Sequence, residues 1–288
     1  MRDQLLTMIE KDGILPPFPE IITRLREMIE DPDTGINDVA RVIQSDPVLA
    51  GRLIHLANSV FGSSSAFFAT ELTRALSRLG LKMAMDLAYS LKVPNLFVEG
   101  NVIDHKLFWR HSLGLGLLSS KLAQHFGGNA TAVSHAYLGG LMRKTGILLF
   151  ANLITEEYAA FLQEIEGELE EKFNGEKKNI ELINIENFEK EAFGICNAEL
   201  GAEFIQKWWS VDPKVVKYVR ERPTDLEGGL KHSIEIARYI LCAEGIPNGV
   251  LSTQGSIPPA YVQARFGLTI EEYEALTSDL STELNVFA

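Results

Sequence analysis

Apolar residues recur along most of the chain at intervals of three and four positions, which is the pattern of amphipathic α-helices. Few stretches alternate apolar and polar residues for long enough to be strands. Turn signals separate the apolar repeats, so one helix is expected after another. The pattern therefore predicts an all-α protein.

Five or six helices are predicted before residue 97. A short first helix covers the apolar residues from Leu5 to Ile9, and Pro19 is placed to open the second, because proline is favoured in the first turn of a helix. Ser45-Asp46-Pro47 is a helix-start signal, a capping side chain followed by proline. A later helix begins at Thr70 and is closed by Gly80.

A connector is predicted from Pro94 to Asn101, followed by a second helical block from about Asp104 to Glu244. Within that block, residues 156–199 carry 13 Glu and four Lys, which we interpret as a solvated helix pair with its turn rather than as an acidic binding tail. Residues 249–288 are a tail. In it, Thr269-Ile270-Glu271-Glu272 matches a capping box and predicts a helix from 269 to 284.

The net charge of the chain and the length of its apolar stretches indicate which partners and which cellular compartment to expect. The 27 Lys and Arg against 39 Asp and Glu give a formal net charge of −12. Such a chain repels nucleic acid and anionic membranes at long range, so we expect neither as a partner. The most apolar stretch, 136–154, is interrupted by Arg143 and Lys144, so no transmembrane helix is predicted, and the first residues show no signal peptide. Cys196 and Cys242 form no CxxC pair, which favours a reduced, cytoplasmic protein without a zinc site.

The motifs of several common enzyme classes are missing. The sequence contains no GxGxxG or GxxxxGK[ST] nucleotide loop, no GxSxG elbow and no HExxH pair. Cys196 has no histidine near it in the sequence that could activate it as a nucleophile, so we interpret it as a structural thiol. Residues 70–89 read as helix, turn and helix, but the second helix offers Lys82 among apolar residues rather than a set of base-reading side chains.

Several short segments follow one another in a characteristic order. They are Leu15-Pro16-Pro17-Phe18-Pro19, Glu30-Asp31-Pro32-Asp33, Ile43-Gln44-Ser45-Asp46-Pro47-Val48-Leu49, Leu56-Ala57-Asn58-Ser59, Leu79-Gly80, Phe108-Trp109-Arg110-His111-Ser112, Leu138-Gly139-Gly140-Leu141, Glu189, Phe193-Gly194, Gly201 and Trp208. Together, over about residues 14 to 245, they resemble the HDOD family of output-type relatives of the HD metal-dependent phosphohydrolases. The resemblance implies an all-α N-terminal helical bundle (residues 1–97), packed against an HD-like helical bundle (98–248), and a short C-terminal helical tail (249–288). It also implies a regulatory role in bacterial signalling.

The resemblance makes the HD metal ligands testable in this sequence. The HD pattern supplies a first histidine, a His-Asp pair some thirty residues later and a distant aspartate. Together these side chains hold metal ions that polarise phosphate and activate water. His111 matches the first histidine, but Arg143-Lys144 stands in place of the pair, Asn197 in place of a further histidine and Arg238 in place of the distant aspartate. Arginine has no lone pair for a metal, and fixed cations repel a divalent ion. We therefore expect a catalytically inactive HD-like domain with no metal and no cofactor.

The cations that replace the metal ligands suggest an anion site. Arginine binds phosphate or carboxylate through two parallel hydrogen bonds, so a nucleotide, a cyclic dinucleotide or the acidic side chain of a partner would fit. The alternative is that Glu199, Glu221 and Glu235 pair these cations within the protein and that His111 is a satisfied core histidine. The candidate anion-binding residues are His111, Arg143, Lys144, Asn197, Arg220, Arg222 and Arg238.

Three functions therefore follow from the sequence. The first is a non-catalytic signal-transduction module that contacts signalling protein partners in trans. The second is a metal-dependent phosphohydrolase of HD type that acts on nucleotides or phosphodiesters. The third is a sensor that binds an anionic small molecule at the former metal site. The replaced ligands favour the first function over the second.

Overall fold

The computed structural model describes residues 1–10, 20–61, 69–92, 100–173, 184–208, 212–220, 232–251 and 257–284. Within these ranges the regular structure is helical and no strand occurs, so the all-α prediction is confirmed. The helices are α1 (Arg2–Glu10), α2 (Glu20–Glu30), α3 (Ile36–Gln44), α4 (Pro47–Phe61), α5 (Leu72–Lys92), α6 (His105–His125), α7 (Ala130–Met142), α8 (Thr145–Leu153), α9 (Thr155–Phe173), α10 (Ile185–Phe193), α11 (Asn197–Trp208), α12 (Pro213–Arg220), α13 (Ser233–Ala243), α14 (Pro259–Phe266), α15 (Ile270–Thr277) and α16 (Leu280–Glu283).

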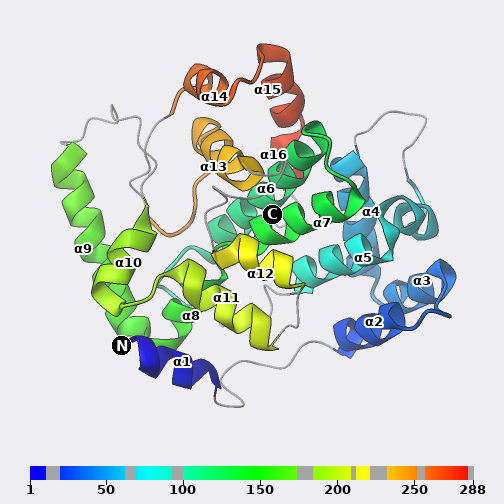
Figure 1. Cartoon of the computed structure of the whole chain (residues 1–288), viewed down its shortest axis with the longest axis horizontal. Coiled ribbons are helices and arrows are strands. Elements are labelled where there is room, and N and C mark those ends of the chain that lie inside the picture. The colour runs from blue at the N-terminus through cyan, green and yellow to red at the C-terminus, as the bar shows by residue number, and fades with distance from the viewer. Residues whose placement is uncertain are drawn as a thin grey trace.

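Helices α2 to α5 form a first bundle at one side of the molecule (Figure 1). Helix α5 lies against α2, α3 and α4, and it bends sharply at Gly80, which has a φ of 74°. Glycine adopts this left-handed conformation without steric cost, so the prediction that Gly80 closes a helix is confirmed. At the start of α4, Asp46 Oδ1 accepts a hydrogen bond of 2.9 Å from the Leu49 backbone, as the start signal in the sequence predicts.

Helices α6 and α7 form the centre of a second bundle, with α13 packed on α6 and α12 packed on α7. Two adjacent glycines bring the helices close together. A Cβ atom added at Gly140 would lie 2.7 Å from the Leu115 backbone oxygen of α6, and one at Gly139 would lie 2.7 Å from Tyr218 of α12. Because only glycine fits at these positions, α7 is held directly between α6 and α12.

Helix α1 packs on the second bundle. The sequence assigns residues 1–97 to one N-terminal bundle, but α1 lies against α11 of the second bundle, on the side of the molecule away from α3 (Figure 1). Leu5 and Ile9 are the buried residues of α1, and Glu10 at its end lies 3.7 Å from Lys207 of α11. The apolar period predicts the helix correctly, but it carries no information about which bundle the helix covers.

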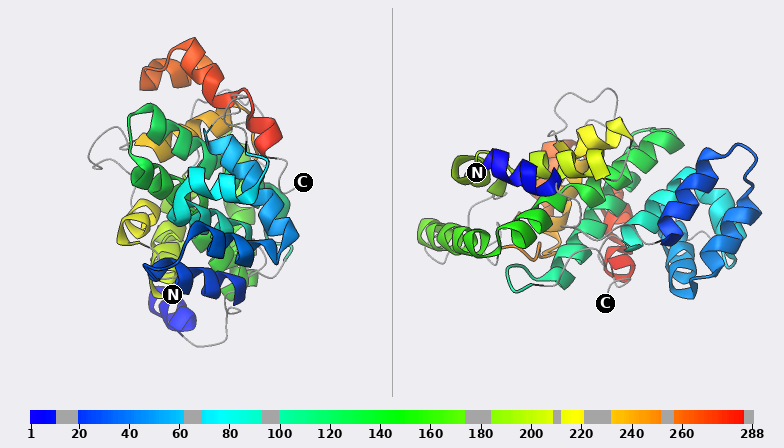
Figure 2. Two further views of the ribbon diagram at one scale, coloured as in Figure 1. Left: turned by 90° about the vertical axis from the view of Figure 1, so that its right-hand side faces the viewer. Right: turned by 90° about the horizontal axis from the view of Figure 1, so that it is seen from below.

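The described residues of the C-terminal tail form three helices, and the single helix predicted from 269 to 284 is divided into α15 and α16. The capping box at Thr269 is confirmed, since its side chain accepts from the Glu272 backbone at 3.1 Å. Helix α15 lies on α6 and α16 lies on α4, so the tail contacts both bundles, as the two views of Figure 2 allow the reader to follow. A buried ion pair of 2.8 Å between Lys121 of α6 and Glu283 of α16 fixes its end.

The apolar stretch around α7 and α8 is part of the core of the second bundle. No single helix in the described ranges has both the length and the apolar composition of a membrane span. The helical segments 131–153 and 155–171 meet the criteria of length and composition only when they are taken together, and the chain bends by 118° between them.

Candidate functional site

The segment Arg143-Lys144 joins α7 to α8 in the interior of the second bundle. Its position is fixed by the packing of α8 on α11, because a Cβ atom at Gly146 would overlap the backbone of Asn197. Another close approach at Gly201, where an added Cβ would lie 2.8 Å from the Gly146 nitrogen, holds the same two helices together. The segment that replaces the His-Asp pair is therefore held rigidly beside the first residue of α11.

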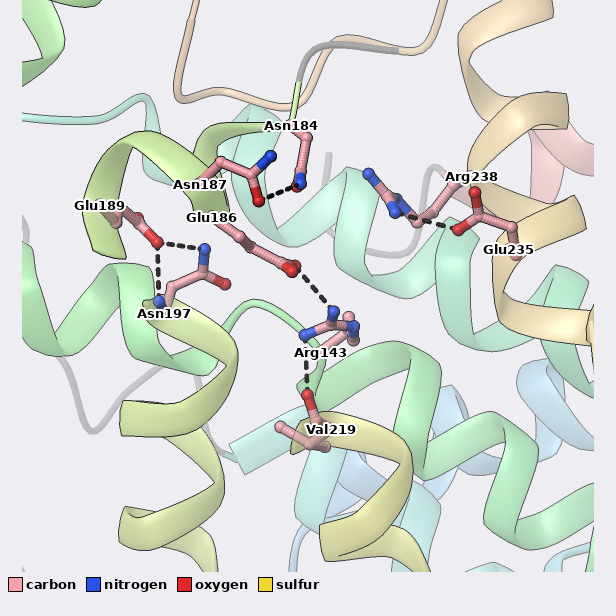
Figure 3. A network of polar contacts seen from close by, with 9 residues as sticks. All are labelled: Arg143, Asn184, Glu186, Asn187, Glu189, Asn197, Val219, Glu235 and Arg238. Carbon is pink, nitrogen blue, oxygen red and sulfur yellow. Dashed lines mark hydrogen bonds and ion pairs between the residues drawn. The ribbon is translucent and has the colours of Figure 1, made fainter. Parts of the chain in front are cut away.

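Arg143 is buried and joins three helices. Its Nη1 donates to the Val219 backbone oxygen of α12 at 2.7 Å, and its Nη2 donates to Glu186 Oε1 of α10 at 2.7 Å (Figure 3). The side chains of Arg143 and Glu186 are 4% and 17% exposed. Val219 lies in the last turn of α12, where backbone oxygens carry the negative end of the helix dipole. Arg143 is thus held by the protein itself.

His111 on α6 has both ring nitrogens occupied. Its Nδ1 lies 3.3 Å from the Ile246 backbone oxygen and its Nε2 lies 3.4 Å from Lys144 Nζ. A carbonyl oxygen only accepts, so Nδ1 carries the proton and Nε2 is left to accept from the lysine ammonium. Burial lowers the pKa of His111 well below its ordinary value, and the neighbouring charge of Lys144 lowers it further. His111 is therefore neutral and faces a cation.

Lys144 lies in a cationic environment. Burial lowers its pKa to about 7, and the nearby charges of Arg238 and Arg143 act in the same direction, against Glu186 and Glu189. Among the described residues, no carboxylate oxygen lies within 4 Å of Lys144 Nζ. The lysine therefore holds its proton only partly at neutral pH.

Arg238 on α13 lies on the other side of this environment. Its Nη1 donates to Glu235 Oε2 on the same helix at 3.0 Å, and the two side chains are 13% and 25% exposed. The charge of Arg238 acts on both Lys144 and His111, and in Figure 3 its guanidinium group extends from α13 toward α10. His111, Arg143, Lys144 and Arg238 thus meet in one part of the second bundle, as the sequence predicts.

Asn197 belongs to a neighbouring buried network. Its backbone nitrogen and its Nδ2 both donate to Glu189 Oε2, at 2.7 and 2.6 Å, while the Tyr158 hydroxyl donates to Glu189 Oε1 at 2.7 Å. Burial raises the pKa of Glu189 to about 7, although these three hydrogen bonds oppose the rise. Both carboxylate oxygens of Glu189 are thus engaged by Asn197 and Tyr158.

Arg220 does not join the cation cluster. It is exposed at the end of α12, where its Nη2 lies 3.0 Å from Glu203 Oε1 of α11. Glu199, expected to pair with a cation of the site, instead lies 2.6 Å from Lys190 of α10, an exposed surface partner. Arg222 and Glu221 lie outside the described residues.

The internal ion pairs of the site were only partly expected from the sequence. Glu235 is confirmed as the partner of Arg238. The partner of Arg143, Glu186, is one of 13 glutamates between residues 156 and 199, and no spacing in the sequence distinguishes it from the others. The Ile246 carbonyl that orients His111 has no side-chain signal at all.

Comparison with known proteins identifies the protein family. The family model of the HDOD domain matches residues 15–224. The chain belongs to the HDOD family. A curated relative from Treponema pallidum (strain Nichols), described only as an uncharacterized protein, is 24% identical over 202 residues, which cover 70% of this chain and 36% of that protein. This HDOD chain therefore spans little more than a third of the relative's length.

Solved structures share the HDOD architecture at low sequence identity. A protein from Shewanella amazonensis SB2B, provisionally named a phosphohydrolase, has a TM-score of 0.64 at 22% identity, covering 98% of this chain and 96% of that chain. A provisionally named signal transduction protein from Marinobacter aquaeolei VT8 has a TM-score of 0.59 at 20% identity, covering 99% and 64%. An HDOD domain protein of unknown function from Geobacter sulfurreducens has a TM-score of 0.59 at 20% identity, covering 100% and 97%. These likenesses establish the fold.

The residues of this HDOD protein do not fit an HD-type metal centre. In the described ranges, no three or more His, Cys, Asp or Glu side chains gather where they could hold a metal ion. His111, which matches the first HD ligand, accepts from Lys144, and the arginines at positions 143 and 238 have no lone pair to offer a metal.

Proposed function

We propose that this HDOD protein is a non-catalytic regulatory module of signal transduction that acts through contacts with signalling protein partners. The distance of 3.4 Å between His111 Nε2 and Lys144 Nζ carries the proposal. The imidazole nitrogen that an HD enzyme would use for its metal accepts from the protein's own ammonium group. Lys144 therefore takes up the ring nitrogen that would have to bind the metal.

Electrostatics supports the non-catalytic half of the proposal. Burial depresses the pKa of Lys144, and the charges of Arg238 and Arg143 lower that pKa further. A divalent ion brought among them would be repelled by each, with energies that fall only inversely with distance. Glu186 and Glu235 are engaged with Arg143 and Arg238, so using them as metal ligands would take a carboxylate partner away from each of these guanidinium groups.

The regulatory half of the proposal draws on the family and on a structural neighbour. The HDOD match covers most of the chain, and a neighbour of the same fold carries a signal-transduction name. A module without its own chemistry transmits a signal by binding, and the two bundles with their connecting tail provide the surface for it. The competing function, an HD-type phosphohydrolase, requires the metal that the donor set opposes.

The proposal is tested by adding divalent metals to the chelator-washed chain. We expect Mg²⁺, Mn²⁺, Fe²⁺ and Zn²⁺ to leave the unfolding midpoint unchanged, because a ligand raises the midpoint only when it binds the native state. Hydrolysis of bis(p-nitrophenyl) phosphate should stay at the rate of a metal-only blank. A midpoint that rises with Mn²⁺ in the wild-type chain but not in His111→Ala, together with turnover, would establish the phosphohydrolase and overturn the proposal.

A further inference from the structure

Lys144 is the cation of the site whose charge is left uncompensated. Arg143 has Glu186 and Arg238 has Glu235 within hydrogen-bonding distance, whereas within the described ranges Lys144 Nζ contacts only the neutral ring of His111. An isolated ammonium group taken out of water is strongly disfavoured unless it is paired. Glu186 and Glu189 act on Lys144 only from a distance, so in the described structure its ammonium group has no carboxylate in direct contact.

The donors around that charge come from three separate parts of the chain. Lys144 lies directly before α8, His111 lies in the middle of α6, and Arg238 lies on α13. In the described structure Glu235 engages Nη1 of Arg238, which leaves N–H groups on the remaining nitrogens of the guanidinium. Asn184, directly before α10, has a buried Oδ1 that makes no hydrogen bond to the described residues.

From this geometry we infer that Lys144 and Arg238, with His111 beside them, bind the phosphate group of a small phosphorylated ligand. The inference rests on the proposed function in one respect, that the position holds no metal ion. It adds a ligand class to that function, and a ligand bound between α6, α8 and α13 is placed to regulate how these helices pack.

Three features favour a phosphate group over other anions. A phosphate has oxygens in several directions and can accept from donors on different helices at once, whereas a carboxylate lies in one plane. The guanidinium and the ammonium are the two side chains that most often bind phosphate, the first as a planar fork and the second as a point charge. Finally, Lys144 is largely buried, which favours a small ligand over an acidic side chain on the surface of a partner protein.

Binding should be linked to proton uptake. Burial and the charge of Arg238 hold the pKa of Lys144 at about 7 in the free protein, and an adjacent anion favours the ammonium form. An anion whose own charge stays constant should therefore bind more weakly as the pH rises above about 7. Sulfate has the geometry of phosphate and does not titrate in this range, so it isolates the contribution of the protein.

The test uses the full chain in a chelator and a phosphate-free buffer, with inorganic phosphate as the probe and calorimetry and the unfolding midpoint as readouts. We expect phosphate to raise the midpoint, and Lys144→Met to weaken phosphate binding about ten- to hundredfold, the loss of one charge-assisted contact. Lys106→Met is the matched control. Lys106 is an exposed lysine of α6, so the variant has the same net charge but should bind phosphate as the wild type does. Sulfate should bind the wild type more weakly at about pH 9 than at about pH 7, and this dependence should vanish in Lys144→Met.

Each contrary outcome has a separate meaning. If phosphate has no effect, or stabilises both lysine variants and the wild type equally, the site does not bind phosphate and the inference is wrong while the proposed function stands. If an acidic peptide stabilises the protein through Lys144 and phosphate does not, the ligand is a protein partner and the inference is again wrong. If phosphate binds only after a divalent metal is added, the proposed non-catalytic function fails as well.

Discussion

Replacing Arg143 with methionine should destabilise the protein by about 3–5 kcal/mol, the usual cost of breaking a buried ion pair from one side. The substitution removes the 2.7 Å hydrogen bonds to the Val219 backbone oxygen and to Glu186. It also takes the arginine away from the Glu186 carboxylate, whose side chain is only 17% exposed. Urea unfolding of the two proteins measures the difference. Arg220→Met is the matched control, because the surface ion pair of Arg220 with Glu203 should contribute less than about 1 kcal/mol.

A second substitution separates the lost ion pair from the lost packing. Glu186→Gln in the Arg143→Met background removes the stranded negative charge, so the double variant should recover part of the lost stability. If Arg143→Met unfolds at the same urea concentration as the control, Arg143 does not hold α7, α10 and α12 together. The account of why this arginine is unavailable to a metal or a ligand would then be wrong.

Replacing Lys144 with methionine should stabilise the protein at pH 7 and below and should remove a rise in stability at higher pH. Burial and Arg238 lower the folded-state pKa of Lys144 to about 7 from its ordinary value of 10.5. Between these two values the unfolded chain binds more protons than the folded chain, so the free energy of unfolding rises with pH, by up to about 1.4 kcal/mol per pH unit. Methionine has a similar length and carries no proton, so the variant lacks this rise.

The measurement compares unfolding free energies of wild type and Lys144→Met between about pH 7 and about pH 9 in a buffer without phosphate. The advantage of the variant should shrink steadily across this range. Glu189 contributes in the opposite sense at lower pH, because its folded-state pKa is raised to about 7 and the stability this provides is lost as the pH rises toward that value. A difference between the two proteins that does not change with pH would show that Lys144 is solvated and fully charged.

Much of the fold follows from local patterns in the sequence. The apolar period predicts α1, the Asp46 cap and Gly80 predict where helices begin and end, and the capping box at Thr269 is present. What local pattern does not predict is which helices touch. The docking of α1 on α11 and the division of the tail into three helices depend on contacts between residues far apart in the chain.

The sequence likewise predicts some residues of the candidate site and misses others. The resemblance to the HD pattern brings His111, Lys144, Arg143 and Arg238 to one place, and the structure places them there. It also puts Arg220 at that site, but the helical register of α12 turns this side chain to the surface while the neighbouring Val219 carbonyl faces Arg143. Backbone acceptors of this kind have no signature in the sequence.

The state of the His111 ring tests the central claim most directly, which is that Lys144, and not a metal ion, occupies Nε2 of the histidine that matches the first HD ligand. Nitrogen NMR of the imidazole should show a neutral ring with the proton on Nδ1 at about pH 6, because burial and Lys144 hold its pKa well below the ordinary value. Adding Zn²⁺ should leave both ring nitrogens unshifted. A His111 signal that titrates near its ordinary pKa, or a Zn²⁺-dependent shift of Nε2, would contradict the account.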